Sequence, residues 1–474
     1  MTYKKTKIVA TLGPACDSEE MIKKLSHEGV NVFRINFSHA NYDNVTRIVR
    51  DIRKMNKELG HNVAILADLQ GPKLRVGDMG NGVKLKTGDN FIFTTNECKG
   101  SNKMAYMTYQ KFAQDVKVGE TILVDDGKLS FEVIETNNID QVTTKILVDG
   151  ILHSKKGVNL PNTKISQPAL TKKDKADAKF AISLEVDWIA LSFVRSANDL
   201  KKLRKLIKKY SDCKIPIIAK IEKPEAIRNI DEIVRKSDGV MVARGDLGVE
   251  LPMEKVPLLQ KMIVEKAKLA RVPVIIATQM METMIEDSVP TRAEINDVAN
   301  SIMDGADAVM LSGETSVGKH PLKVIGQIRR VIESVENSPR ITVSQKAPHI
   351  RTKRYMTKSI CYHAALMAND VEAKAIQTLT NSGYTAFQIS AWRPNANILA
   401  FTSNKRILSR LNLLWGVKAF FYDENKSTDD TVQDLEDIAK KEGYVHERDM
   451  VITLSSMPVQ EKGMVNTLRL TEIK

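Results

Sequence analysis

Residues 214–245 read KIPIIAKIEKPEAIRNIDEIVRKSDGVMVARG, and their pattern decides the fold. Two short apolar runs, 214–222 and 238–245, stand on either side of a longer helical pattern. Strands that are apolar almost throughout are typical of a parallel sheet that is buried on both faces. A strand, a helix and a second strand in this order therefore predict a βαβ unit.

The same alternation recurs through much of the chain. Eight apolar runs fit it: KIVATL (7–12), NVFRINF (31–37), NVAILADL (62–69), VDWIALSF (186–193), KIPIIAKIE (214–222), DGVMVARG (238–245), VPVIIATQM (272–280) and ADAVMLSG (306–313). Eight such units predict an α/β fold built on a (β/α)8 TIM barrel.

The gap between the third and fourth runs is too long for one crossover helix. Residues 72–167 contain short alternating runs broken by Gly, Asp and Asn, such as GETILVDDGKLSFEVIE (119–135). This pattern is typical of small all-β domains. It predicts a small β-barrel domain inserted after the third barrel strand, because a long insertion in a loop costs little closure entropy.

A polar stretch, 338–354, follows the last helical pattern of the barrel and is interpreted as a linker. Four further strand patterns then predict a C-terminal α/β domain: 374–379, 397–402, 417–422 and 449–454. The predicted domain limits are 1–71 with 168–341 for the barrel, 72–167 for the inserted domain and 352–474 for the C-terminal domain.

The charge of the chain raises two classes of partner. Lys and Arg number 71 against 58 Asp and Glu, a net charge of +13, so nucleic acid and anionic small molecules are both candidates. The most basic segment, NDLKKLRKLIKKY (198–210), has an apolar helical stripe of Leu200, Leu203, Leu206, Ile207 and Tyr210. Its cations then lie on a solvated face, and aromatic residues are only 5% of the chain. We expect no nucleic acid partner.

Cysteine usage and hydropathy indicate the compartment. The four cysteines are far apart and form no CxxC or Cys/His cluster, so we expect reduced thiols and no structural zinc site. No apolar run of about 18 residues occurs, and the N-terminal run is too short for a signal peptide. We expect no membrane partner and a cytoplasmic location.

Polar or charged residues end nearly every predicted barrel strand, where the catalytic groups of such barrels lie. They are Arg34, Asn36, Asp68, Ser192, Lys220, Glu222, Asp246, Thr278, Ser312 and Glu314. Arg34, Asn36 and Ser38 alternate, so a strand period of two predicts that they share one face. A guanidinium suits phosphate, although a simple salt bridge at the barrel rim is an alternative for Arg34.

Lys220 and Glu222 also alternate, and Asp246 ends the next run. Two carboxylates are too few for an all-protein cage, but they suit Mg²⁺, which keeps waters and binds substrate oxygens. A Lys220–Glu222 ion pair is the alternative. Residues 244–248 predict a strand-to-helix turn whose N–H groups bind an anion. Thr278 could relay a proton, bind a carboxylate or cap a helix. This inventory of cations and metal ligands is what phosphoryl transfer needs.

Segments along the whole chain resemble the pyruvate kinase family. They are TLGPA, FRINFSH, DLQGPKLR, KKGVNLP, AKIE, MVARGDLGVE, ATQMMETM, PTRAEINDVANSIMDGADAVMLSGET and HPL, in this order. The resemblance implies phosphoryl transfer from phosphoenolpyruvate to ADP in glycolysis, giving pyruvate and ATP, with the inserted domain as a lid. A metal-dependent 2-oxo acid aldolase on a similar barrel is the alternative, but it explains neither the lid nor the nucleotide residues.

The resemblance also assigns roles to residues. It implies that the catalytic residues are Lys220, Arg34, Thr278 and Ser312. The substrate would be bound by Arg34, Gly245, Asp246 and Thr278. The nucleotide would be bound by Arg75, Lys156, Asn36 and His39. Glu222 and Asp246 would bind Mg²⁺ (or Mn²⁺).

One segment departs from many members of the family, which read DTKGPE before the lid and require K⁺. Here Lys73 stands where those members carry Glu. The implied K⁺ ligands are Asn36, Ser38, Asp68 and Leu69. A lysine ammonium can supply the charge that K⁺ otherwise brings, so we expect activity that does not require K⁺.

The C-terminal domain contains a segment, Thr380-Asn381-Ser382-Gly383-Tyr384-Thr385, between a predicted strand and a predicted helix. Hydroxyls and a Gly turn at a helix start suit a phosphate, although such turns are common. The segment corresponds to the effector loop of the family, so we expect a sugar-phosphate effector. The resemblance also implies a homotetramer.

Overall fold

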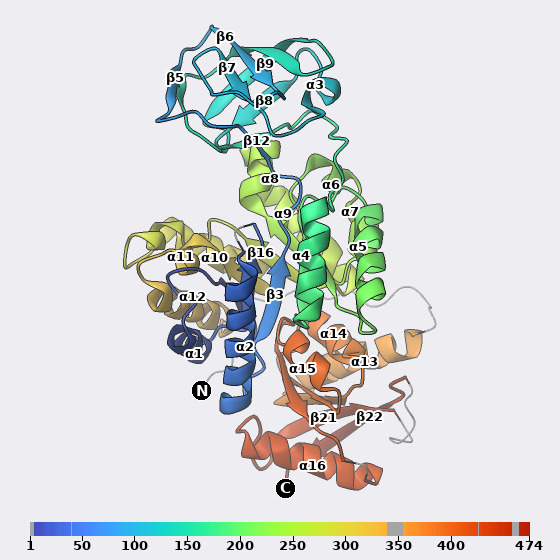
Figure 1. Cartoon of the computed structure of the whole chain (residues 1–474). Coiled ribbons are helices and arrows are strands. Elements are labelled where there is room, and N and C mark those ends of the chain that lie inside the picture. The colour runs from blue at the N-terminus through green and yellow to red at the C-terminus, as the bar shows by residue number, and fades with distance from the viewer. Residues whose placement is uncertain (1–3, 39, 339–353, 425, 457–463) are drawn as a thin grey trace.

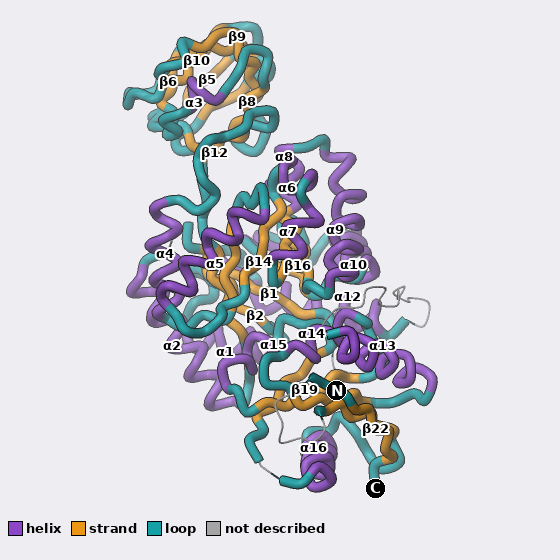
Figure 2. Tube along the Cα trace, turned by 90° about the vertical axis from the view of Figure 1, so that its right-hand side faces the viewer, coloured by secondary structure: helices purple, strands orange, loops and turns teal. Residues whose placement is uncertain are grey.

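The computed structural model describes residues 4–38, 40–338, 354–424, 426–456 and 464–474. Three units follow one another along the long axis of the molecule (Figure 1). An all-β unit lies at one end, a barrel in the middle and a C-terminal α/β unit at the other end. Figure 2, turned by 90°, shows the same arrangement.

The middle unit is a closed barrel of parallel strands, as predicted. Its order is β1-β17-β16-β15-β14-β13-β3-β2. The bounds are β1 Lys7–Thr11, β2 Val32–Asn36, β3 Ala64–Asp68, β13 Trp188–Leu191, β14 Ile217–Ile221, β15 Gly239–Ala243, β16 Val274–Ala277 and β17 Ala308–Leu311. Each of the eight predicted runs contains one of these strands.

Helices surround the barrel. They are α1 Glu19–Glu28, α2 Tyr42–Leu59, α4 Lys172–Ser183, α5 Ala197–Tyr210, α6 Pro224–Arg228, α7 Ile230–Lys236, α8 Arg244–Glu250, α9 Val256–Ala270, α10 Arg292–Asp304, α11 Gly313–Ser316 and α12 Pro321–Glu336, with short 3₁₀ turns at Met253–Lys255 and Glu282–Ile285. Helix α5 has the predicted buried stripe at Leu200, Leu203 and Ile207. Tyr210 departs from it, since it is exposed beside Lys179 and Lys209.

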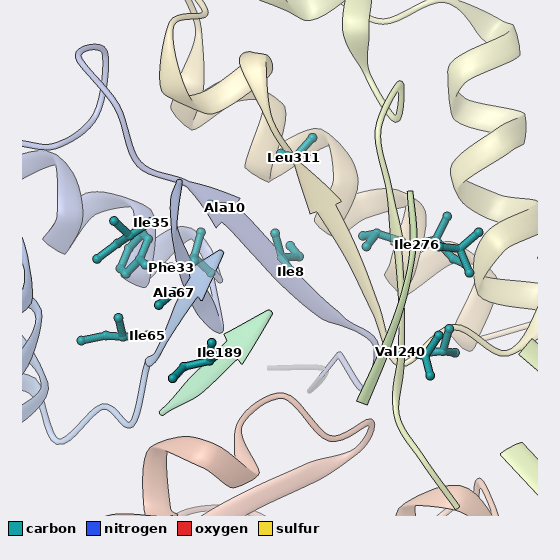
Figure 3. Packing of buried hydrophobic residues seen from close by; sticks show 14 of the residues in the cluster. Ile8, Ala10, Phe33, Ile35, Ile65, Ala67, Ile189, Val240, Ile276 and Leu311 are labelled. Atoms are coloured by element: carbon teal, nitrogen blue, oxygen red, sulfur yellow. The ribbon is translucent and has the colours of Figure 1, made fainter. Parts of the chain in front are cut away.

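The strands bury both faces because successive side chains point to opposite sides. Ile8 and Ala10 of β1 pack outward in the layer between strands and helices (Figure 3). Val9, between them, packs inward with Trp188 and Met241. Two apolar layers on one ring of strands leave most polar groups toward the strand ends, and this places the candidate site there.

The all-β unit is inserted between β3 and α4, as predicted. Its elements are β4 Leu74–Arg75, β5 Val83–Leu85, β6 Asn90–Thr94, β7 Met104–Tyr106, α3 Phe112–Asp115, β8 Thr121–Val124, β9 Leu129–Thr136, β10 Gln141–Ile146, β11 Gly150–Leu152 and β12 Gly157–Asn159. Seven strands form one sheet in the order β4-β12-β8-β9-β10-β6-β7. A bridge between Val76 and Met107 joins its two edges, so the sheet curls around a core of its own.

The C-terminal unit has a five-stranded sheet in the order β20-β19-β18-β21-β22. Its elements are α13 Tyr355–Asp370, β18 Ala375–Leu379, α14 Tyr384–Ala391, β19 Asn397–Thr402, α15 Lys405–Leu411, β20 Val417–Phe421, α16 Thr428–Lys441, β21 Met450–Ser455 and β22 Thr467–Glu472. The four predicted strands are present. The edge strand β22, antiparallel to β21, is an addition that the sequence interpretation lacked.

Two features bear on the remaining predictions. Most of the predicted linker, 339–353, lies outside the described residues, and the predicted domain limits remain a prediction. In the part of the chain that the structure describes, no helix is both long enough and apolar enough to cross a membrane.

Candidate active site

Four barrel strands bring their charged ends together through one chain of contacts. Arg34, at 8% exposure, directs both Nε and one terminal nitrogen at Asp68 Oδ2, each at 2.7 Å. Lys220 Nζ lies 3.4 Å from Asp68 Oδ1 and 2.8 Å from Glu222 Oε1. Ser192 Oγ accepts a hydrogen bond from Lys220 Nζ at 2.8 Å. The Arg34 salt bridge and the Lys220–Glu222 ion pair, both considered as alternatives, are therefore present. Lys220 contacts the carboxylate of each pair.

The charges of this cluster shift one another's pKa. Burial alone favours the neutral amine, but Asp68, Glu222 and Asp246 raise the pKa of Lys220 above its ordinary value. Lys220 and Arg34 overcome burial and hold the pKa of Asp68 below its ordinary value. Burial raises the pKa of Glu222, and Asp246 adds to this while Lys220 opposes it. The site thus holds a fixed ammonium beside carboxylates that repel one another.

The repulsion between Glu222 and Asp246 would be relieved by a cation bound beside them. Both donors are hard carboxylate oxygens, which suit Mg²⁺. Glu222 is held in place because its Oε2 accepts the Phe193 N–H at 2.6 Å. Among the residues described, no three His, Cys, Asp or Glu side chains converge to hold a metal. A cation here would therefore complete its shell with water and substrate oxygens.

The strand-to-helix turn after β15 is tied to the end of β16. Thr278 Oγ1 accepts the Gly245 N–H at 2.7 Å and donates to the Ala277 carbonyl at 2.6 Å. Its hydroxyl therefore accepts an N–H from the first turn of α8. This contact resembles the helix-capping role that was the alternative for Thr278. Thr278 has φ of 70°, which is a strained value for a β-branched residue. Strain of this kind is concentrated at functional sites.

Arg244 holds that strained segment, a role that the sequence interpretation missed. Its guanidinium donates to the Thr278 carbonyl at 2.7 Å and to Asp297 at 2.6 Å. The signal was present in the sequence, because Arg244 opens the predicted anion-binding turn. The pattern of residues 244–248 indicates only the backbone N–H groups of that turn.

A cavity of about 290 Å³ lies between the inserted unit and the barrel rim. The residues that line it include Lys73, Arg75, Lys155, Lys156, Phe193, Arg195, Lys223 and Asp246. Arg75 donates to the Lys155 carbonyl at 2.7 Å, and Lys156 pairs with Asp125 at 2.8 Å. Desolvation lowers the pKa of Lys73, and the negative charge of Asp246 opposes this shift. Lys73 therefore lies within electrostatic reach of the Asp246 carboxylate. Cations therefore outnumber carboxylates on the inserted side, where Asp125 and Asp126 also line the cavity.

Other predicted site residues are placed differently. The prediction that Ser38 continues the strand is wrong, because β2 ends at Asn36 and Ser38 lies in a turn. The Ser38 N–H donates to Asn36 Oδ1 at 3.1 Å. The Leu69 carbonyl accepts the Ser192 hydroxyl at 2.6 Å. The implied K⁺ ligands thus contact one another or the Lys220 cluster.

Three further predicted site residues are His39, Ser312 and Asn36. His39 lies outside the described residues. The Ser312 N–H donates to Glu314 Oε2 at 2.7 Å, and Glu314 is buried. Asn36 is absent from the lining of the cavity that contains Arg75 and Lys156.

Residues 380–383 connect β18 to α14, and Tyr384 and Thr385, predicted to precede the helix, are its first two residues. Gly383 has φ of 81°, which favours glycine, and its N–H donates to Thr380 Oγ1 at 3.0 Å. Arg354 lies over the Tyr384 ring, 4.3 Å from its centroid. The loop is thus a tight turn at a helix start with a cation beside it.

Comparison with known proteins bears on the whole chain. Residues 3–325 match the family model "Pyruvate kinase, barrel domain", and residues 358–471 match "Pyruvate kinase, alpha/beta domain". The pyruvate kinase of Geobacillus stearothermophilus is 41% identical over 473 residues, which cover 98% of this chain and 80% of that protein. The pyruvate kinase of Mycobacterium tuberculosis H37Rv is 40% identical over 469 residues, 98% of each chain.

A solved structure agrees with these matches. A pyruvate kinase from Cryptosporidium parvum superposes with a TM-score of 0.92 at 33% identity, covering 99% of this chain and 96% of that one. The aldolase alternative is not favoured by any of these comparisons. The chain therefore belongs to the pyruvate kinase family and is a phosphotransferase.

Proposed function

We propose that the chain transfers the phosphoryl group of phosphoenolpyruvate to ADP, with Mg²⁺, and gives pyruvate and ATP. The observation that carries this is the Lys220 cluster. One ammonium lies among Asp68, Ser192 and Glu222, next to a cationic cavity that Asp246 also lines. Phosphoryl transfer depends on such positioning and charge neutralisation.

The proposed roles of the residues follow from the charges. The phosphorus–oxygen bond to the enol breaks, its electron pair stays on the enol oxygen, and a β-phosphate oxygen of ADP bonds to phosphorus. Lys220 and Arg34 stabilise the charge on the transferring group. Mg²⁺ at Glu222 and Asp246 would supply further charge neutralisation. The backbone N–H groups of Gly245 and Asp246, with Thr278, hold the carboxylate of the substrate.

The remaining enolate must take a proton on carbon. We assign this step to water held near Thr278 and Ser312, whose hydroxyls can donate a proton and accept another. The Thr278 hydroxyl now links Gly245 to Ala277, so a bound carboxylate would compete for the Gly245 N–H. Arg75 and Lys156 bind the nucleotide phosphates, and the inserted unit closes as a lid that excludes water.

The decisive assay measures release of pyruvate from phosphoenolpyruvate with and without ADP. The proposal requires that release depend on ADP and that ATP form in equal amount. Release of pyruvate without ADP, or cleavage of a 2-oxo acid with aldehyde formation, would favour the aldolase alternative.

We further propose a cytoplasmic homotetramer, as the family resemblance implies.

Activity without K⁺ is the first prediction. We expect equal rates within about twofold in buffers with and without K⁺, because Lys73 places a cation within reach of Asp246. Lys73→Glu is expected to create a K⁺ requirement, and Lys99→Glu, at an exposed lid lysine, serves as the matched control. A many-fold loss of rate in K⁺-free buffer, restored by K⁺, would contradict the prediction.

The second prediction concerns the loop 380–385. We expect a sugar phosphate to lower the phosphoenolpyruvate concentration at half-maximal rate by about fivefold or more, the usual range of allosteric coupling. Ser382→Asp should abolish the shift, because a carboxylate repels the phosphate. Titration of several sugar phosphates against the saturation curve measures it, and no shift with any of them would remove support for an effector site.

A further inference from the structure

A second lysine–glutamate pair lies under the lid, beside the proposed site. Lys223 follows Glu222 in the chain, and its Nζ donates to Glu250 Oε1, at side-chain exposures of 9% and 1%. Asn159 of the lid strand β12 donates its Nδ2 to the same oxygen at 2.9 Å. Glu250 Oε2 is buried and receives no hydrogen bond from the described residues.

The position of this contact connects two functional elements. Glu250 ends α8 one helical turn after Asp246, so the two carboxylates share a face of the helix. Asn159 ends β12, and Lys156 directly precedes that strand. One hydrogen bond therefore joins the helix that carries Asp246 to the strand next to Lys156.

Other contacts hold the two segments that connect the lid to the barrel. The Gly71 N–H donates to Asp174 Oδ1 at 2.9 Å, where the chain leaves the barrel. Arg195 donates to the carbonyls of Ile165 and Gln167, at 2.5 Å and 2.8 Å, where it returns. These contacts fix the two hinge segments, whereas the Asn159–Glu250 contact fixes the sheet of the lid itself.

We propose that Glu250, charge-compensated by Lys223, is a positioning residue that anchors the lid through Asn159. The anchor sets the distance between Lys156 and Asp246, and so places the nucleotide phosphates against the phosphoryl donor. An ionised acceptor makes a stronger hydrogen bond than a neutral one. Lys223 is required because a buried carboxylate without a partner is strongly destabilising. The inference rests on the proposed function.

Asn159→Ala is expected to raise the KM for ADP about tenfold, the effect of losing one hydrogen bond to a charged group. The KM for phosphoenolpyruvate should stay within about twofold, since Asn159 contacts Glu250 and lies on the lid. Asn159→Asp should do more harm than Asn159→Ala, because two carboxylates then face each other. Asn162→Ala, at an exposed lid asparagine, is the matched control and should change neither KM.

The double variant Asn159→Asp/Glu250→Gln exchanges amide and carboxylate and should restore the KM for ADP. A residue that only stabilises the fold would instead lower Tm and move both KM values together. Equal changes in the two KM values, or no recovery in the double variant, would overturn the inference. Failure of the proposed function is seen separately, as pyruvate release by the unaltered protein that does not depend on ADP.

Discussion

Lys220→Met should lower kcat for phosphoryl transfer by about 10²–10³-fold, the usual cost of removing one group that stabilises transition-state charge. Lys220 Nζ is fixed by Ser192, Asp68 and Glu222, so no reorganisation is needed when charge develops on the transferring group. The raised pKa of Lys220 keeps it charged throughout the assay range. Pyruvate release at saturating phosphoenolpyruvate and ADP measures the loss.

A second variant separates catalysis from folding. Lys220→Met leaves Asp68 and Glu222 buried without their shared cation, which destabilises the fold by about 3–5 kcal/mol. Lys220→Arg keeps the charge but replaces a point charge by a planar fork. We expect it to retain Tm better and still to lose most of the rate. Lys202→Met, at an exposed position of α5, is the control. Both Lys220 variants within tenfold of the unaltered kcat would contradict the role.

The fold was predictable because burial imposes a pattern on strands. The run 238–245 contains β15, Gly239–Ala243, which is buried at every position. Such a strand must be apolar almost throughout, and this marks it in the sequence. The strand β22 was missed for the opposite reason. It lies at the edge of its sheet and stays partly exposed, so TLRLTE carries charged and polar residues and resembles a loop.

The residue types of the site were predictable, but their contacts were not. Arg34 and Asp68 meet because β2 pairs with β3 in a register that sets Asn36 beside Asp68. That register depends on the closure of the whole barrel. Thr278, with its positive φ, contacts Arg244, which in turn contacts Asp297, and neither residue is a sequence neighbour of Thr278. Glu250 has no local signal in the sequence, because its partner Asn159 is 91 residues away along the chain.

Glu222→Gln should lower kcat by about 100-fold or more and raise the Mg²⁺ concentration needed for half-maximal rate. Loss of a residue that only supports a metal ligand lowers metal affinity or activity by about 10–100-fold. Loss of a direct ligand should lower them at least as much. A glutamine oxygen can still accept the Phe193 N–H, so the backbone at Phe193 stays in place. Its amide then meets the Lys220 ammonium and offers no charge to a cation.

The Mg²⁺ dependence separates this role from a simple ion pair with Lys220. If Glu222 only balanced Lys220, Glu222→Gln would change Tm and kcat but leave the Mg²⁺ curve in place. If Glu222 binds the metal, the curve shifts to higher Mg²⁺, while Glu232→Gln, at an exposed position of α7, leaves it unchanged. A Mg²⁺ titration of all three proteins at saturating substrates decides between the two, because only the loss of a metal ligand weakens Mg²⁺ binding.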